Sequence, residues 1–70
     1  MIRVIGLNDD VFNNIVANYF DLVKTHDQKS NMIEFVPNCE IYMSKAQVRI
    51  YCGNDSIVFL CCDYWRIELE

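Results

Sequence analysis

Apolar positions in the second half of the chain follow the two-residue period of β-strands. Gln47–Cys52 and Ile57–Cys62 are two such runs, and the turn Gly53-Asn54-Asp55-Ser56 separates them. This arrangement predicts a β-hairpin. The run Ile57–Cys62 is apolar on both faces, and a strand of that kind needs cover on both sides. The chain offers one good helix as cover, so we expect one face of this sheet to seek a partner.

The start of the chain predicts a strand followed by a helix. Met1–Ile5 is rich in β-branched residues and is ended by Gly6. Asn8 is a good helix N-cap. With Asn8 as the cap, Asp9 and Asp10 fall in the first turn, where the helix dipole favours negative charge. A helix is therefore expected to begin at residue 9.

Apolar residues at three- and four-residue spacing extend this helix. Leu7 and Phe12 occupy the two positions of a hydrophobic staple, which supports the same start. The spacing predicts an amphipathic helix that runs to about Thr25. Its apolar stripe consists of Phe12, Ile15, Val16, Tyr19, Phe20 and Val23.

The remaining segments predict more strands joined by short polar connections. Asp27–Asn31 is a polar loop, and a bend is expected near Cys62-Asp63. The further expected strands are Met32–Val36, Cys39–Met43 and a short tail strand, Tyr64–Leu69. Residues 1–70 are thus expected to form a single small α+β domain. Its N-terminal amphipathic helix packs on one face of a mostly antiparallel sheet of four to five strands, in the order β-α-β-β-β-β.

The two hairpins have a predictable register, because a slip of one residue would expose every apolar side chain. A loop at Asn54-Asp55 pairs Cys52 with Ile57, Ile50 with Phe59, and Val48 with Cys61. A loop at Lys45-Ala46 pairs Met43 with Val48, Ile41 with Ile50, and Cys39 with Cys52. All of these pairs are apolar and share one side, which we expect to be the core covered by the helix.

The reverse face of the same sheet is the candidate functional surface. It carries aromatic and aliphatic side chains and one arginine: Tyr42, Gln47, Arg49, Tyr51, Val58, Leu60, Cys62 and Tyr64. Tyrosine and arginine are enriched at protein interfaces, and an exposed apolar patch needs an explanation. The candidate partner-binding residues are Tyr42, Arg49, Tyr51, Leu60, Cys62 and Tyr64. Alternatively, the N-terminal strand, the tail or the Asp27–Asn31 loop covers this face. The tail itself has the pattern of an edge strand that could pair with another chain.

Composition and charge narrow the class of partner. The net charge is −4, and the six Lys and Arg residues are dispersed, so direct nucleic-acid binding is not expected. The charge also serves solubility. The apolar runs are too short to span a membrane, and the N-terminus lacks the apolar region of a signal peptide. A cytoplasmic location is expected.

Cysteine and histidine are the residues with reactive or metal-binding potential. Cys39, Cys52, Cys61 and Cys62 have the spacing C-x12-C-x8-C-C, which contains no CxxC motif. Their favoured interpretation is as small buried hydrophobes. A Cys39–Cys52 disulfide and a zinc site of Cys39, Cys52, Cys61 and His26 are alternatives, and Cys62 is the thiol most open to reaction. No catalytic residues, metal or cofactor are expected.

These observations favour a non-enzymatic protein-interaction module. Small size, seven asparagines and the lack of motifs are reminiscent of small virus-encoded or phage-encoded accessory proteins. Such proteins inhibit host proteins, acting in the host cytoplasm, by docking on them. The alternatives are a homodimeric structural subunit that associates through the sheet face, and a small cysteine-based metal or redox protein.

Overall fold

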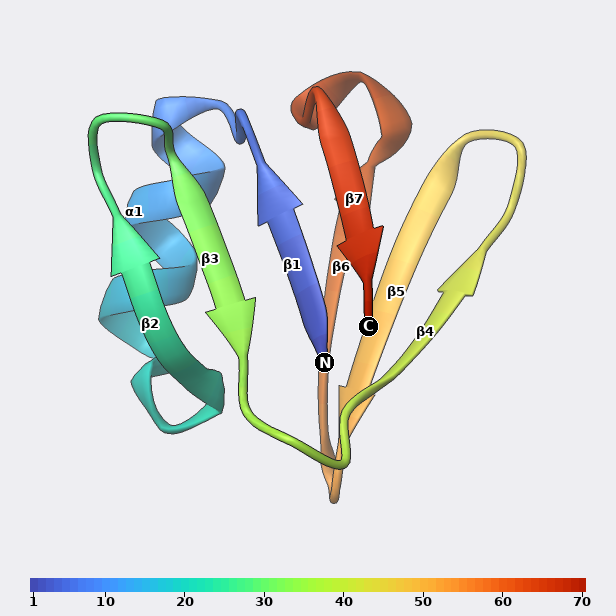
Figure 1. Cartoon of the computed structure of the whole chain (residues 1–70). Helices are drawn as coiled ribbons and strands as arrows, with labels where there is room; N and C mark the ends of the chain where they lie inside the picture. Colours follow the sequence, from blue (N-terminus) through green and yellow to red (C-terminus); the bar gives the residue numbers. More distant parts are fainter.

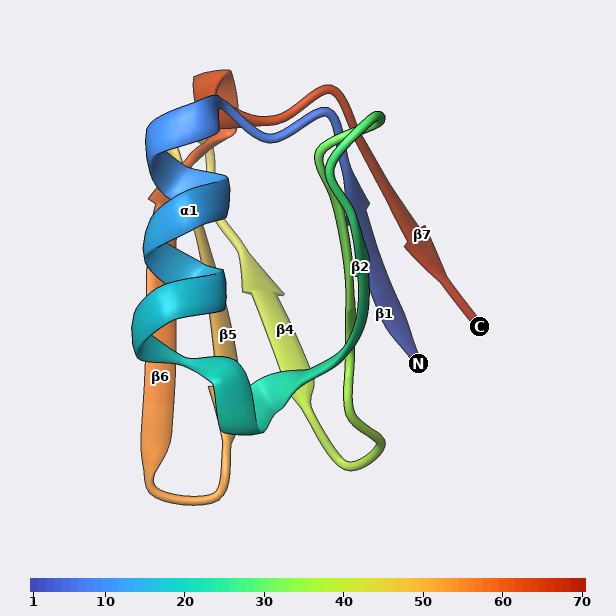
Figure 2. The ribbon, with the colours of Figure 1, turned by 90° about the vertical axis from the view of Figure 1, so that its left-hand side faces the viewer.

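Two antiparallel β-sheets face one another in the computed structural model, which describes all residues, 1–70 (Figures 1 and 2). The four-stranded sheet has the order β2-β3-β1-β7, and the three-stranded sheet has the order β4-β5-β6. The strands are β1 (Ile2–Ile5), β2 (Val23–Asp27), β3 (Met32–Phe35), β4 (Glu40–Met43), β5 (Gln47–Cys52), β6 (Asp55–Leu60) and β7 (Arg66–Leu69). One helix, α1 (Asp9–Asn18), completes an α+β fold of the class that the sequence predicts.

The start of α1 confirms the predicted helix cap. Asn8 is the N-cap residue, and Asp9 and Asp10 lie in the first turn. The Asn8 side chain, however, does not bond to the helix. Its Nδ2 donates to Asp63 Oδ1 over 2.9 Å, so this residue joins the helix to the turn that precedes β7.

The helix ends seven residues before the predicted position. A short 3₁₀ turn, η1 (Phe20–Leu22), follows α1, and β2 (Val23–Asp27) then pairs with β3. The prediction of helix to Thr25 was therefore wrong. The bend buries Leu22, which lay outside the predicted stripe, and leaves Phe20 65% exposed. The β-branched residues of this segment suit a strand, and pairing with β3 supplies the backbone hydrogen bonds that the helix would have made.

The hairpin between β4 and β5 has the predicted register. Met43 pairs with Val48, and Ile41 pairs with Ile50. The hairpin between β5 and β6 is shifted by two residues, so that Val48 pairs with Phe59 rather than with Cys61.

The turn explains the shift. Gly53, not Asn54, is the first residue of the two-residue loop, and its φ is +62°. A type II′ turn requires a residue with positive φ at this position, which glycine adopts without strain. A shift of two residues keeps every side chain on its predicted face.

The core lies between the sheets, and α1 closes one side of it. Figure 2 shows α1 running beside β6 and facing β2 across the gap between the sheets. Twelve apolar side chains are buried. They come from both sheets, from η1, from α1, and from Leu7, which precedes the helix cap. Four inner residues of the two predicted hairpins are among them: Val48, Ile50, Ile57 and Phe59. Met43, which was also predicted to face the core, is 57% exposed because it ends the edge strand β4. The inner face of the three-stranded sheet is thus covered by the second sheet as well as by the helix.

The C-terminal tail pairs within its own molecule. A 3₁₀ turn, η2 (Cys61–Asp63), makes the predicted bend, and β7 then pairs with β1 as an edge strand. Gly6 lies next to this crossing with φ +75°, and a Cβ atom there would be 2.7 Å from the Cβ of Trp65. The two chain ends lie side by side (Figure 1), and Glu70 N–H donates to the carbonyl of Met1 over 2.9 Å.

Candidate functional site

The outer face of the three-stranded sheet is uncovered. Side chains alternate along its strands, so that one set enters the core and the other points to solvent. By this alternation and the strand register, the outward set is Glu40, Tyr42, Gln47, Arg49, Tyr51, Ser56, Val58 and Leu60. Three of these large apolar side chains are exposed by about half: Tyr42 by 58%, Val58 by 45% and Leu60 by 51%. Neither the N-terminal strand, the tail nor the Asp27–Asn31 loop covers them, because all three belong to the four-stranded sheet or its turns.

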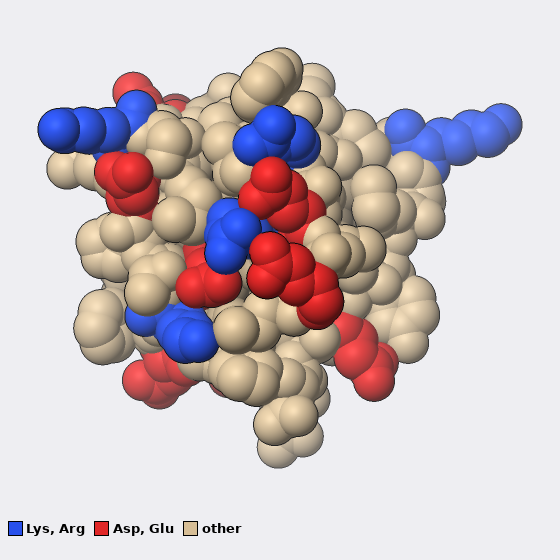
Figure 3. Space-filling view, viewed as in Figure 1, with Lys and Arg blue, Asp and Glu red and all other residues tan.

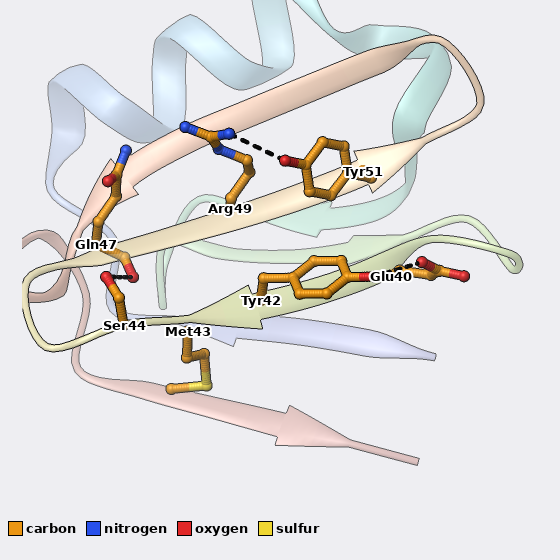
Figure 4. A pocket seen from close by; sticks show the side chains of 7 residues that line it. All are labelled: Glu40, Tyr42, Met43, Ser44, Gln47, Arg49 and Tyr51. Atoms are coloured by element: carbon orange, nitrogen blue, oxygen red, sulfur yellow. Dashed lines mark hydrogen bonds between the residues drawn. The ribbon is translucent and has the colours of Figure 1, made fainter.

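An aromatic and charged cluster lies at the centre of this face (Figure 4). The rings of Tyr42 and Tyr51 meet edge to face, with 5.3 Å between their centroids. The Arg49 guanidinium lies 5.8 Å from the centroid of the Tyr51 ring, and its Nη1 donates to the Tyr51 hydroxyl over 3.0 Å. At the edge, the Tyr42 hydroxyl donates to Glu40 Oε2 over 3.2 Å. These contacts hold flexible side chains in defined positions.

The cluster borders a shallow hollow of about 590 Å³. Its lining comes from β4, from β5 and from the turn between them: Glu40, Tyr42, Met43, Ser44, Gln47, Arg49 and Tyr51. The hydrogen bond to Glu40, followed by the negative charge of Glu40, raises the pKa of Tyr42. Tyr42 is therefore a neutral phenol at physiological pH. The hollow offers one cation, one anion and two tyrosine rings, which is chemistry for recognition by contact.

The structure brings together four of the six predicted partner-binding residues. Tyr42, Arg49, Tyr51 and Leu60 share the outer face. Cys62 is exposed but lies in η2, beyond the end of β6. Tyr64 does not belong to this face, because its ring packs edge to face on the core residue Phe59, with 5.6 Å between centroids. The 3₁₀ turn breaks the two-residue alternation after Leu60, and extending that alternation through Cys62 and Tyr64 misplaced Tyr64.

Val58 was predicted to lie on this face but was left out of the six partner-binding candidates. It lies on β6 directly opposite Arg49, whereas the predicted register, which is two residues off, implies Leu60 at that place. The correct turn would have identified this pairing, since a glycine followed by asparagine is itself a signal for a two-residue hairpin loop. Phe20 and Trp65 are the most exposed large apolar side chains, at 65% and 74%, but Phe20 lies in η1 and Trp65 just before β7, so neither belongs to the outward set.

The outer face of the four-stranded sheet has a different chemistry. Figure 3 shows basic and acidic side chains gathered over its centre. Arg3 on β1 contacts Glu34 and Glu68 on the two flanking strands, each over 3.0 Å, and Glu70 over 3.7 Å. Thr25 on β2 donates to Glu34 over 3.1 Å. Desolvation acts to raise the pKa of Glu34. The hydrogen bonds from Thr25 and Arg3 and the positive charge of Arg3 outweigh this effect, so that the pKa is lowered.

The cysteines are all free thiols. Burial and the neighbouring thiol of Cys52 raise the pKa of Cys39 to about 12. His26 lies in β2 of the other sheet, where its ring packs against Phe12 with 5.9 Å between centroids. The structure does not bring the four residues considered for zinc together, and no three His, Cys, Asp or Glu side chains form a group that could hold a metal ion.

No helix in the structure has the length and apolar character needed to cross a membrane. The chain matches no protein-family model, no curated protein and no solved structure in comparisons with each. The function has to be inferred from the surfaces described above.

Proposed function

We propose that this protein is a non-enzymatic interaction module that binds a partner protein through the outer face of its three-stranded sheet. The observation that carries the proposal is the uncovered row of Tyr42, Arg49 and Tyr51 beside Val58 and Leu60. Tyrosine and arginine are the residues that most often dominate binding energy at protein interfaces. An apolar patch on a small domain that stays uncovered by its own chain is typical of an interaction site.

The arrangement of the cluster also favours binding. Arg49 is already held by the ring and hydroxyl of Tyr51, and Tyr51 is held by the ring of Tyr42. Side chains that are ordered before binding lose less conformational entropy when a partner arrives. We expect binding alone to act on the partner, most simply by blocking it as an inhibitor does.

A pull-down with matched variants tests the proposal. Tyr51→Ala and Leu60→Asp should abolish partner capture while the circular dichroism spectrum and the midpoint of thermal unfolding stay close to those of the wild type. Arg49→Ala should weaken capture. Arg66→Ala is the matched control. The Arg66 guanidinium also lies over an aromatic ring, 5.1 Å from the centroid of Trp65, but Arg66 belongs to the four-stranded sheet. Capture that is unaffected by both Tyr51→Ala and Leu60→Asp would refute the proposal.

The same face could be occupied by a second copy of the chain. Sedimentation equilibrium distinguishes the two cases. A dimer that Tyr51→Ala or Leu60→Asp converts to monomer would assign the face to self-association rather than to a partner of different sequence. A monomeric wild type leaves the face free for such a partner.

A further inference from the structure

A groove runs between α1 and the free edge of β6, apart from the tyrosine cluster. It has a volume of about 300 Å³, and its walls come from the helix on one side and the strand on the other. Four consecutive strand residues line it, from Ile57 to Leu60. Because neighbouring residues of a strand point to opposite faces, a groove lined by all four lies along the edge of the strand and not over either face.

No strand pairs with the backbone of β6 along this groove. Cys61 N–H donates to the Ala46 carbonyl over 3.0 Å, which marks these two as a hydrogen-bonded pair in the β5–β6 register. Bonded and non-bonded pairs alternate in antiparallel strands, so the N–H and C=O of Val58 and Leu60 point away from β5. Leu60 N–H is satisfied by Asp63 Oδ2 over 3.0 Å. The N–H and C=O of Val58 have no partner within the protein.

The charge of the groove is negative. Its nine lining residues include Asp10 on α1 and Asp63 in η2, and none of them is basic. Neither aspartate forms an ion pair within the molecule, since every salt bridge lies on the four-stranded sheet. Asp63 accepts hydrogen bonds from the uncharged Asn8 side chain and from Leu60 N–H, which leaves its negative charge without a counterion. The helix also contributes apolar surface through the partly exposed Val11, while Ile15 below it is fully buried.

From these observations we infer that the groove binds an extended segment of a partner protein, which adds to the edge of β6 as a new strand. The segment pairs with the N–H and C=O of Val58 by the hydrogen bonds of a β-ladder. It carries apolar residues at alternate positions, which contact Val11, and a lysine or arginine that reaches Asp10 and Asp63. The inference goes beyond the proposed function, since the groove needs neither Arg49 nor Tyr51.

A displayed library of random peptides of about ten residues, the length of a long strand, is the probe. It is selected on the full chain and in parallel on Asn14→Trp, which places a large side chain in the groove from an exposed helix position. Asn13→Trp is the matched control, because Asn13 is exposed on the same helix but does not line the groove. Peptides enriched on the wild type should carry Lys or Arg among alternating apolar residues. They should bind at least about tenfold more weakly to Asn14→Trp and equally well to Asn13→Trp.

Amide hydrogen exchange identifies the site directly. The bound peptide should slow exchange of the Val58 amide, and Asp10→Asn should weaken binding of the basic peptides. The inference is overturned if no peptide is enriched over the Asn14→Trp selection, or if the Val58 amide exchanges as fast with peptide as without. Peptides that bind Asn14→Trp as well as the wild type, but do not bind Tyr51→Ala, would also overturn the inference. They would support the proposed function instead. A dimer of the wild type that Asn14→Trp dissociates would assign the groove to a second copy instead.

Discussion

Arg3 and Arg49 lie at equivalent places on opposite sides of the molecule, and their surroundings differ. Each projects from an interior strand onto the outer face of its sheet. Arg3 contacts three glutamates, two of them from the flanking strands β3 and β7. Arg49 forms no ion pair and donates a hydrogen bond to Tyr51, and its cross-strand neighbours are Tyr42 and Val58. One face satisfies its charges internally, whereas the other presents a cation, two tyrosines and aliphatic side chains to solvent.

This difference is the one that the proposed function expects, with one face suited to water and the other to a partner. Cross-strand ion pairs make the four-stranded face polar and discourage contact with other chains, since an approaching protein would have to desolvate four charged groups. Covering the three-stranded face would desolvate fewer charged groups. A comparison of the two arginines therefore tests the functional proposal within one chain.

The largest effect is expected inside the three-stranded sheet, not on its outer face. Ile50→Ala removes a fully buried side chain and should lower the free energy of unfolding by about 2–5 kcal/mol. Arg49→Ala, one residue away on the exposed side, should change it by less than about 0.5 kcal/mol. Urea denaturation followed by circular dichroism measures both. A large loss of stability with Arg49→Ala would mean that the outer face is structural, and would break the comparison.

The next largest effect is expected from the matched pair Arg3→Gln and Arg49→Gln. Removing the cation at residue 3 leaves three glutamates facing one another, so the midpoint of thermal unfolding should fall. Salt should reduce the difference from the wild type, because it screens this repulsion. Arg49→Gln should leave the midpoint almost unchanged at any salt concentration. Equal effects of the two substitutions would contradict the distinction between the faces.

A smaller effect is expected from acid. The folded-state pKa of Glu34 lies below its usual value of 4.5, so its ionised form stabilises the fold. This contribution is present above the unfolded pKa and is lost as the pH falls through the folded pKa. Unfolding midpoints measured from pH 7 downward should therefore fall less below about pH 4.5 in Glu34→Gln than in the wild type. Identical profiles would show that the network does not hold Glu34 ionised.

The smallest effect on stability is expected from modification of the thiols, although their rates of modification should differ clearly. Cys62 is exposed, whereas Cys39 is half-buried with a pKa of about 12. Because the thiolate is the reactive form, iodoacetamide at pH 8 should modify Cys62 well before Cys39, with little change in unfolding. Mass spectrometry of timed digests gives the order. Modification of Cys39 first would indicate that the inner side of the β4–β5 hairpin opens readily.

Local patterns in the sequence accounted for most of the fold. The cap at Asn8 and the acidic first turn identified where the helix begins, because these interactions involve neighbouring residues only. Alternation identified the faces of β4, β5 and β6, and this survived a register error of two residues because the side-chain period is two. The same alternation grouped four of the partner-binding candidates, Tyr42, Arg49, Tyr51 and Leu60, on one face.

Other features depended on contacts between distant residues. Whether Val23–Asp27 continued the helix or formed a strand was decided by pairing with β3 and by burial of Leu22, which no local pattern contains. Tyr64 does not lie on the predicted surface, because the η2 turn places its ring against Phe59.

The sequence by itself determined the class of fold, the helix start and which side chains share a face. Each of these follows from local propensity and from the period of the apolar pattern. The tertiary structure alone decided that the strands divide into two sheets, that the tail completes one of them, and that a groove lies between α1 and β6. These features arise from burial and backbone pairing between segments far apart in the chain, where many arrangements have similar local patterns and only packing of the whole molecule selects one.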